Sequence, residues 1–356
     1  MKIRGGDLDL VEFEFSSFRP GENIRTINLE KTYQLHPTQS SVQVTAPARV
    51  HLSVLDMNRF APGTPGGGGI GFALQIYCTV TVSCTPSGLT IQYTRPPLIE
   101  HFAKVFMKTV GYTGGFHIQA KDHNYLHVGL GSTSTILIAL AVALNKAVGE
   151  PLNREDLRYL VGHNYIEETD DGNVAFGFET GVGPAATCYG GFVALGDRLT
   201  LINQHKFAEY KKAYIVIPTS ESSSAGNDEF ELLMNKARTL DYRDREQKAY
   251  FIMMDMIPAL VRGDIIHMGE VMWEIEFRGS KRAEIEHHSF EIYQYMHSLR
   301  QAGLEFVGMS SVGPSIVIVT DKEKGEMEAI VEPLGLKVKI ATAVDNEGIR
   351  ITSSNE

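Results

Sequence analysis

The sequence has few cysteines, no basic cluster and no long apolar run, and each absence excludes a class of function. The three cysteines, Cys78, Cys84 and Cys188, form neither a CxxC pair nor a metal-ligand spacing, so we expect reduced thiols in the core. Lysine and arginine number 33 against 43 acidic residues, for a net charge of −10. This balance argues against nucleic acids and anionic membranes as partners.

No apolar run reaches the roughly 18 residues of a membrane span. The longest, TILIALAVAL, is too short. The N-terminal stretch MKIRGGDLDLVEFEF alternates acidic and apolar residues and lacks the basic and then apolar order of a secretory signal. We therefore expect a cytoplasmic protein that acts on small molecules and has no membrane partner.

Strands and helices are predicted in an irregular order, which favours an α+β fold with two lobes around a cleft. We expect an N-terminal β extension over 1–40, an N-terminal lobe with a phosphate loop over 41–204, and a C-terminal lobe over 205–356. Four elements of the first half are predicted in detail: a strand over 42–56 broken at Pro47, a β-hairpin joining 72–84 to 89–94, a helix over 153–168 and a strand over 185–197.

The stretch GLGSTSTILIALAVA, from Gly129, has the pattern of an anion site. Gly129 and Gly131 permit a tight turn, and Ser132 to Thr135 crowd the start of an apolar helix, whose free amides and dipole favour a phosphate. The hydroxyls can donate to phosphate or bind Mg²⁺. The stretch lacks the lysine of a Walker loop. Taken alone, it also fits an ordinary core helix with a glycine turn.

Three segments together resemble the motifs of the GHMP superfamily of small-molecule kinases. They are PARVHLSVLDMN at 47–58, GLGSTS at 129–134 and GMSSVGPSIVIV at 308–319. The resemblance implies a GHMP-kinase-like fold, with the second motif as its phosphate loop and the third as a turn facing the cleft.

One position departs from the kinase pattern. Kinases of the superfamily carry a catalytic aspartate in a stretch similar to TGVGPAATCYGG at 180–191, and here Gly183 occupies that position. Glycine can neither take a proton from a hydroxyl nor orient one. An ATP-dependent small-molecule kinase remains the alternative, because some members lack the aspartate, and a catalytically silent binder of a metabolite is a third possibility.

The same segments, with the loop GGGGIGFAL at 66–74, resemble a group within the superfamily: the β-ribofuranosylaminobenzene 5′-phosphate synthases and related C-nucleoside synthases. This resemblance implies an enzyme that joins the ribose 5-phosphate of phosphoribosyl pyrophosphate to the carboxylate-bearing carbon of an aromatic or heteroaromatic ring. CO₂ and pyrophosphate are released. It further implies Mg²⁺ as cofactor and a homodimer, and it leaves the acceptor ring open.

The resemblance and the side-chain chemistry predict three groups of site residues. The catalytic candidates are His51, Asp56 and Glu179. The pyrophosphate ligands are predicted to be Gly129, Gly131, Ser132, Thr133, Ser134, Ser310 and Ser311, of which Ser132 and Thr133 are also the predicted metal ligands. Contacts to the acceptor or the ribose are predicted for Arg49, Asn58, Gly69, Thr180 and Gly183.

Structural roles compete with several of these assignments. His51 also fits a hydrogen-bonded core histidine, Asp56 a loop cap, and Glu179 a surface partner of an arginine. His163 and Glu167 stand at i and i+4 of the predicted helix, which is metal-ligand spacing, but no third ligand accompanies them. We predict a solvated face there, a loop at Asp170 and Asp171, and surface positions for His287 and His288.

Overall fold

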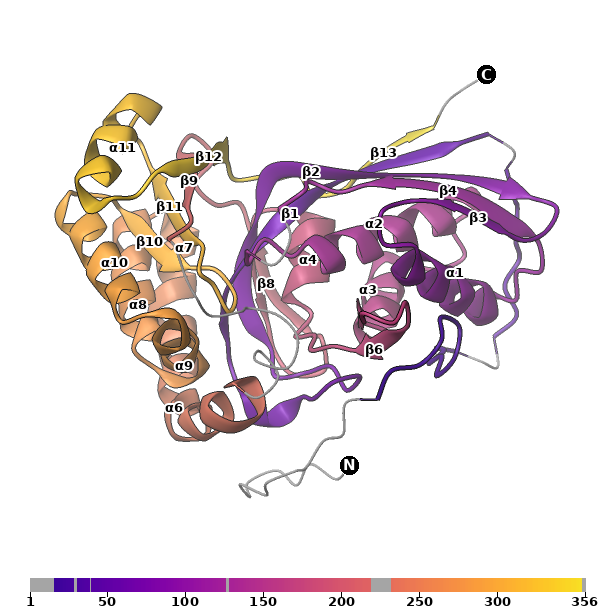
Figure 1. The fold of residues 1–356 in the computed structure, drawn as a ribbon, viewed down its shortest axis with the longest axis horizontal. Coiled ribbons are helices and arrows are strands. Elements are labelled where there is room, and N and C mark those ends of the chain that lie inside the picture. The colour runs from indigo at the N-terminus through magenta and orange to yellow at the C-terminus, as the bar shows by residue number, and fades with distance from the viewer. Residues whose placement is uncertain (1–15, 29–30, 39, 126–127, 219–231, 354–356) are drawn as a thin grey trace.

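The computed structural model describes residues 16–28, 31–38, 40–125, 128–218 and 232–353. Two lobes lie side by side, each a β-sheet with helices packed against it (Figure 1). The predicted α+β fold is confirmed, since the sheets are largely antiparallel and the helices do not alternate regularly with the strands. None of the described helices is long and apolar enough to cross a membrane.

The first sheet is built on two long strands, β1 (Val42–Val54) and β2 (Gly69–Thr85), paired antiparallel. Its order is β13-β1-β2-β4-β3, and β7 and β8 extend it from the other end of β2. The remaining strands are β3 (Leu89–Gln92), β4 (Gly115–Lys121), β7 (Phe192–Leu195), β8 (Leu201–His205) and β13 (Arg350–Ser353).

The predicted hairpin between 72–84 and 89–94 is wrong. Strand β3 pairs in parallel with β4, and β4 pairs antiparallel with Thr79–Thr85 of β2. Helix α1 (Pro96–Val110) connects β3 to β4. Because β4 takes the edge of β2 that a hairpin partner would need, β3 is displaced to the outside of the sheet.

The strand expected to break at Pro47 is continuous. Pro47 lies opposite Tyr77 of β2, and the register shifts between Pro47 and Ala48. A proline has no amide hydrogen to give to the ladder, and an irregular position of this kind accommodates it without ending the strand. Strand β1 therefore carries one continuous backbone from the sheet edge to the cleft.

Two further predicted elements change type along their length. The strand expected over 185–197 begins as a helix, α4 (Val182–Tyr189), between the positive-φ residues Gly181 and Gly190, and only then becomes β7. The helix expected over 153–168 is shorter: α3 (Arg154–His163) ends at His163, and β5 (Ile166–Glu168) pairs with β6 (Val174–Phe176).

Helix α2 (Ser132–Ala147) is the centre of the first lobe. Every residue of it except Lys146 is buried. It packs against β1, β2, α1, α3 and α4, which explains why its sequence is apolar on all sides. Since the helix is enclosed, its N-terminus is held at a fixed place beneath the cleft.

The second lobe has a sheet in the order β10-β11-β9-β12. These strands are β9 (Lys212–Val216), β10 (Phe306–Met309), β11 (Ile316–Thr320) and β12 (Val338–Ala343). The α-helices among the described residues of this half are α6 (Arg238–Phe251), α7 (Ile257–Arg262), α8 (Ile265–Glu276), α9 (Gly279–His288), α10 (Glu291–Gln301) and α11 (Lys324–Val331). After β12 the chain returns to the first lobe, where β13 pairs with β1 (Figure 1). The range 205–356 therefore includes one strand of the first sheet.

The two lobes share a hydrophobic core. Leu52 and Phe72 of the first sheet belong to the same buried cluster as Met272 of α8 and Val317 of β11. The Phe72 and Phe306 ring centroids are 6.1 Å apart across this junction. Each such side chain contributes about 1.5–3 kcal/mol by leaving water, so the cluster stabilises the lobes against separating.

The described residues of the N-terminal segment do not form the β extension predicted over 1–40. Between residues 16 and 38 the described part contains one isolated bridge, Phe18 to Val174. The amide of Arg25 donates to Asn164 Oδ1 at 2.9 Å and that of His36 to the Val148 carbonyl at 2.8 Å, so residues at two helix ends take the place of a partner strand. The stretch VEFEF at 11–15 lies outside the described residues.

Candidate active site

The glycine loop starts α2 in the way its sequence predicts. Gly129 has φ of 84° and Gly131 of 67°, a left-handed conformation that glycine adopts without strain. A Cβ at Gly129 would lie 2.4 Å from the Ser310 carbonyl oxygen, and one at Gly131 would lie 2.5 Å from Arg49 Nε. Both positions therefore require glycine.

All three motifs meet at this loop. The Gly129 carbonyl accepts hydrogen bonds from Arg49 Nη1 at 3.0 Å and from Ser310 Oγ at 2.6 Å. The Ser311 amide in turn donates to the His51 carbonyl at 2.6 Å. The turn of the second lobe is thus joined to both the first motif and the phosphate loop, as the resemblance predicts.

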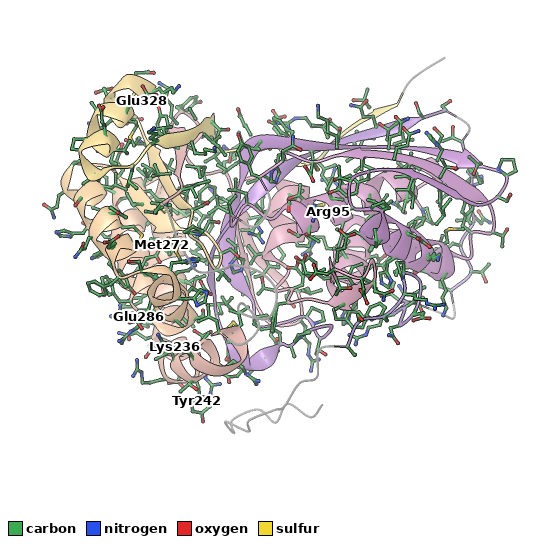
Figure 2. All side chains as sticks on the ribbon, in the orientation of Figure 1. Arg95, Lys236, Tyr242, Met272, Glu286 and Glu328 are labelled. Atoms are coloured by element: carbon green, nitrogen blue, oxygen red, sulfur yellow. The ribbon has the colours of Figure 1, made fainter. Side chains whose placement is uncertain are left out.

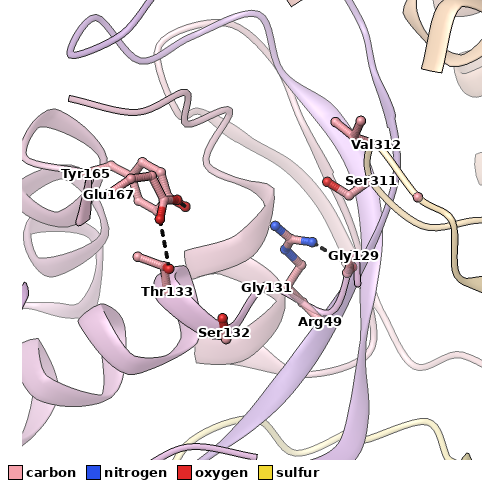
Figure 3. A pocket seen from close by; sticks show the side chains of 10 residues that line it. Arg49, Gly129, Gly131, Ser132, Thr133, Tyr165, Glu167, Ser311 and Val312 are labelled. Atoms are coloured by element: carbon pink, nitrogen blue, oxygen red, sulfur yellow. Dashed lines mark hydrogen bonds between the residues drawn. The ribbon is translucent and has the colours of Figure 1, made fainter. Parts of the chain in front are cut away.

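A pocket opens above the N-terminus of α2 (Figure 3). It is lined by Arg49, Gly129, Gly131, Ser132, Thr133, Tyr165, Glu167, Ser311, Val312 and Gly313. The Arg49 guanidinium lies on one side, and Tyr165 and Glu167 lie on the other (Figure 3). The helix N-terminus and Arg49 make this pocket suitable for an anion.

Tyr165 and Glu167 are pocket residues that sequence reasoning missed. Thr133 Oγ1 donates to Glu167 Oε2 at 3.2 Å, and the Tyr165 hydroxyl donates to Glu167 Oε1. The prediction that His163 and Glu167 share the solvated face of one helix is wrong, because α3 ends at His163 and Glu167 lies in β5 and lines the pocket. Alternation along a strand would have placed Tyr165 and Glu167 on one face.

Arg95, in the first lobe (Figure 2), fixes the orientation of the Thr133 hydroxyl. Its Nη1 donates to Thr133 Oγ1 at 3.0 Å, while Nη2 donates to the Tyr93 hydroxyl at 2.7 Å. A guanidinium can only donate, so the hydrogen of Thr133 goes to Glu167. The Thr133 oxygen retains one lone pair for a further partner, which suits a cation ligand better than a phosphate donor.

His51 is a buried, uncharged histidine beside the pocket. Burial lowers its pKa well below 6.5, and the nearby charges of Arg49, Lys281 and Lys248 lower the pKa further. Its Nε2 lies 3.2 Å from Thr180 Oγ1. A Cβ at Gly69 would lie 3.3 Å from the same nitrogen. The structure thus groups the predicted residues His51, Thr180 and Gly69.

Glu179 has the protonation behaviour of an acid–base group. Burial raises its pKa to about 7, against the opposing effects of the Gly181 amide and the Arg49 charge. The Gly181 amide donates to Glu179 Oε1 at 2.7 Å. A carboxyl with a pKa near the working pH can both take and return a proton, so a surface role as partner of an arginine does not describe it.

Gly183 lies directly against the phosphate-loop helix. A Cβ there would be 2.6 Å from Ser134 Oγ and 3.5 Å from Arg49 Nε. An aspartate would therefore displace Ser134, whose hydroxyl donates to the Gly131 carbonyl at 3.2 Å. Ser134 is also only 1% exposed, so its hydroxyl closes the loop and is directed away from a ligand in the pocket.

Asp56 and Asn58 lie beyond the far end of β1, and neither is among the described residues that line the pocket. Asp56 accepts the Asn58 amide at 2.9 Å and pairs with Arg245 at 3.2 Å and Arg59 at 3.5 Å. Its carboxylate caps the short helix Met57–Arg59. The capping alternative therefore describes Asp56 better than the predicted catalytic role.

Comparison with known proteins agrees with this arrangement. The family model for the GHMP kinases N terminal domain matches residues 97–180. This part of the chain is therefore similar to the N-terminal domain of the GHMP kinases. The matched range contains the glycine loop and the whole of α2, so it includes the second of the three motifs. The predicted resemblance to the GHMP superfamily is confirmed.

The chain is also similar to two archaeal proteins named beta-ribofuranosylphenol 5′-phosphate synthase. The one from Methanothermobacter thermautotrophicus is 27% identical over 333 residues, covering 86% of this chain and 97% of the relative. The one from Archaeoglobus fulgidus is 24% identical, and the match covers 81% of this chain and 90% of the relative. The likeness thus extends over nearly the full length of both relatives.

Solved structures show the GHMP fold in more distant proteins. Homoserine kinase from Cytophaga hutchinsonii superposes with a TM-score of 0.63 at 16% identity, over 89% of this chain and 99% of the other. Mevalonate diphosphate decarboxylase from Staphylococcus aureus superposes with a TM-score of 0.62 at 17% identity, over 88% of this chain and 98% of the other. At these identities the match establishes the fold alone.

Proposed function

We propose that this GHMP chain is a decarboxylative C-riboside synthase. It joins the ribose 5-phosphate of phosphoribosyl pyrophosphate to the carboxylate-bearing carbon of an aromatic ring. The observation that carries the proposal is the position of Gly183, where a side chain would contact Ser134 and the phosphate loop. The glycine loop at the start of α2 still offers a site for an anion, whereas Gly183 takes the place of the aspartate that acts as base in similar kinases. This combination suits a reaction in which pyrophosphate leaves and no strong base is needed. The relatives named as synthases support the same activity.

The bond changes of this reaction need charge stabilisation more than a strong base. The bond from C1 of the ribose to the pyrophosphate oxygen breaks, and the ring carbon bonds to C1. The bond from that carbon to the carboxylate then breaks, CO₂ leaves, and its electron pair restores aromaticity. The amides at the start of α2, the Ser132 hydroxyl and the Arg49 guanidinium would stabilise the departing pyrophosphate; a preorganised donor of this kind typically contributes about 2.7–4 kcal/mol.

The residues at the pocket fit Mg²⁺ as cofactor. Mg²⁺ prefers oxygen ligands and is usually held by one or two carboxylates together with substrate phosphates and water. Ser132, Thr133 and the Glu167 carboxylate offer such oxygens around the α2 N-terminus. Bound there, Mg²⁺ would neutralise charge on the pyrophosphate, and Ser132 and Thr133 keep their predicted role as ligands.

Glu179 and His51 supply the proton transfer that the acceptor needs. A ring hydroxyl or amino group becomes more acidic as the ring carbon attacks C1. Glu179, with a pKa of about 7, and the neutral His51 are both able to accept that proton. We assign this proton transfer mainly to Glu179, because the pKa of its carboxyl is closer to the working pH.

The direct test supplies the protein with Mg²⁺, ATP, phosphoribosyl pyrophosphate and a panel of aromatic carboxylates, including 4-hydroxybenzoate, 4-aminobenzoate and an aminopyrazole carboxylate. We expect pyrophosphate and CO₂ to be released in equal amounts with one of them. Turnover of ATP with phosphoribosyl pyrophosphate left intact would make the protein a kinase. If neither is consumed but one of them still raises the melting temperature, the chain is a silent binder.

A further inference from the structure

Ser311, in the turn between β10 and β11, has a backbone conformation that is rare for residues with a side chain. Its φ is 54°, in the left-handed region that glycine adopts freely and other residues adopt at a cost. Conformations of this kind persist where the surrounding structure fixes them, and they concentrate at functional sites. The turn therefore keeps a serine at a position where glycine would be less strained.

The two backbone groups of Ser311 are held from outside the turn. Its amide donates to the His51 carbonyl of β1 at 2.6 Å, and its carbonyl accepts a hydrogen bond from Lys281 Nζ of α9 at 2.7 Å. The first contact comes from the first lobe and the second from the second lobe. Together they fix the orientation of both peptide groups that flank the Ser311 Cα.

The Lys281 ammonium directs its donors mainly at this turn. Its side chain is 0% exposed, and Nζ lies 2.7 Å from Glu284 Oε2, 2.7 Å from the Ser311 carbonyl and 3.3 Å from the Met309 carbonyl. An ammonium has three donors, so these three acceptors use all of them. Apolar residues can often replace a buried ion pair without loss of stability. The burial of Lys281 is therefore explained better by the turn that it holds than by its ion pair.

The hydroxyl of Ser311 is left for a ligand. Within the described part of the chain it makes no hydrogen bond, whereas the neighbouring Ser310 hydroxyl donates to the Gly129 carbonyl at 2.6 Å. Ser311 lines the pocket together with Ser132, and Figure 3 shows its hydroxyl directed into the pocket, as the Arg49 guanidinium is. A phosphate at the α2 N-terminus would therefore meet a donor from the second lobe as well.

We infer that Lys281 is a positioning residue, which holds Ser311 so that the serine hydroxyl donates to the pyrophosphate at the N-terminus of α2. The inference rests on the proposed function. Lys281 is fully buried and is not among the described residues that line the pocket, so it acts on the ligand through the Ser311 backbone. With both peptide groups fixed, the hydroxyl is oriented before the ligand binds, and little ordering is needed on binding.

Pyrophosphate binding in the presence of Mg²⁺, measured by calorimetry, tests this role without requiring turnover. Ser311→Gly removes the hydroxyl at a position whose φ suits glycine. We expect it to weaken binding about ten-fold, because a hydrogen bond to a charged group is lost. Lys281→Met combined with Glu284→Gln removes the ammonium together with its counter-ion, and it should weaken binding by a similar factor. The two effects should not add, so the triple variant should bind as Ser311→Gly does.

Two further variants separate positioning from a general effect on the fold. Lys281→Gln combined with Glu284→Gln keeps an amide that can donate to the Ser311 carbonyl, so it should recover part of the binding that the methionine variant loses. Arg282→Gln is the matched control, because Arg282 lies on the same helix but is exposed and paired with Glu286, which is labelled in Figure 2. It should bind pyrophosphate as the wild type does.

Several outcomes would overturn the inference. Wild-type pyrophosphate binding in Ser311→Gly would do so whether or not the Lys281 variants fold. Effects of the serine and lysine changes that multiply in the triple variant would also do so, because the lysine would then act independently of the serine. Equal loss in the methionine and glutamine variants would reduce Lys281 to a structural charge. If the methionine variant fails to fold, the glutamine variant replaces it, and Ser311→Gly should then weaken binding less in that variant than in the wild type.

Failure of this inference is distinguishable from failure of the proposed function. If Ser311 and Lys281 are coupled in pyrophosphate binding, yet no product forms from phosphoribosyl pyrophosphate and an aromatic carboxylate, the proposed function fails and the positioning role stands. If product forms while the Lys281 variants bind pyrophosphate as the wild type does, the positioning role fails and the proposed function stands.

Discussion

The two lobes use polar side chains in different ways. In the first lobe Arg49, Thr133 and Glu167 bond to one another or to the glycine loop, and all three line the pocket. In the second lobe the buried ions bind backbone. Lys281 Nζ donates to the Ser311 carbonyl at 2.7 Å, and Glu276 Oε1 accepts the Met309 amide at 2.7 Å.

Buried ions of the second lobe also bind backbone groups at the end of β1. Asp241 and Lys248, both on α6 and both fully buried, bind the Met57 amide at 2.9 Å and the Val54 carbonyl at 2.8 Å. One lobe therefore supplies most of the groups that face a ligand, and the other holds the backbone segments that carry them.

The largest effect is expected from breaking the ion pair of the second lobe. Lys248→Met leaves Asp241 as an uncompensated buried carboxylate, and the loss of one partner of such a pair typically costs about 3–5 kcal/mol. Urea denaturation should show a corresponding fall in the free energy of unfolding. Combining it with Asp241→Asn should recover part of the loss; a double variant less stable than Lys248→Met would contradict the pairing.

A change in the first lobe should affect catalysis with little effect on stability. Ser132→Ala removes a hydroxyl at the α2 N-terminus, and we expect kcat/KM to fall ten-fold or more, a barrier increase of roughly 1.4 kcal/mol. The matched control is Lys146→Ala at the exposed end of the same helix. Unchanged kinetics in Ser132→Ala would remove this serine from the site.

The pH dependence of the rate tests Glu179. Its carboxyl must be ionised to accept a proton, and its pKa is about 7, so kcat/KM should rise as the pH increases through neutrality. Glu179→Gln should be slower and lose that rise. An equally steep pH profile in Glu179→Gln would assign the base to another group, such as His51.

The pH dependence of stability tests Glu276. Burial raises its pKa in the folded protein from 4.5 to about 8. The folded state then holds the proton more tightly than the unfolded state, so this contribution to stability is complete below pH 4.5 and is lost as the pH rises to about 8. The raised pKa of Glu179 makes a contribution to stability of the same sign, and that contribution is lost as the pH rises to about 7.

Glu276→Gln should therefore flatten the fall in stability between weakly acidic and weakly alkaline pH, because glutamine can accept the Met309 amide at any pH. Urea midpoints across that range measure the effect. A slope equal to that of the wild type would mean that Glu276 titrates as an ordinary carboxyl.

Local sequence was sufficient for the phosphate loop. Two glycines that adopt left-handed backbone, followed by hydroxyls and an apolar run, specify a turn and an enclosed helix through contacts close in the chain. Local sequence was insufficient for Tyr165 and Glu167. Whether residues 166–168 extend α3 or form a strand depends on their pairing with β6, and a helical pattern in one segment does not reveal its partner.

The sequence by itself was enough to predict a glycine turn at Gly129 and Gly131 that opens an enclosed helix, and a glycine at position 183 where similar kinases carry an aspartate. Only the tertiary structure decided that β4 separates β2 from β3, that β13 completes the first sheet, and that Tyr165 and Glu167 line the pocket. The physical reason is that conformational preference and side-chain chemistry are properties of a residue and its neighbours along the chain. Strand order, burial and the pairing of charges depend on segments that meet only after folding.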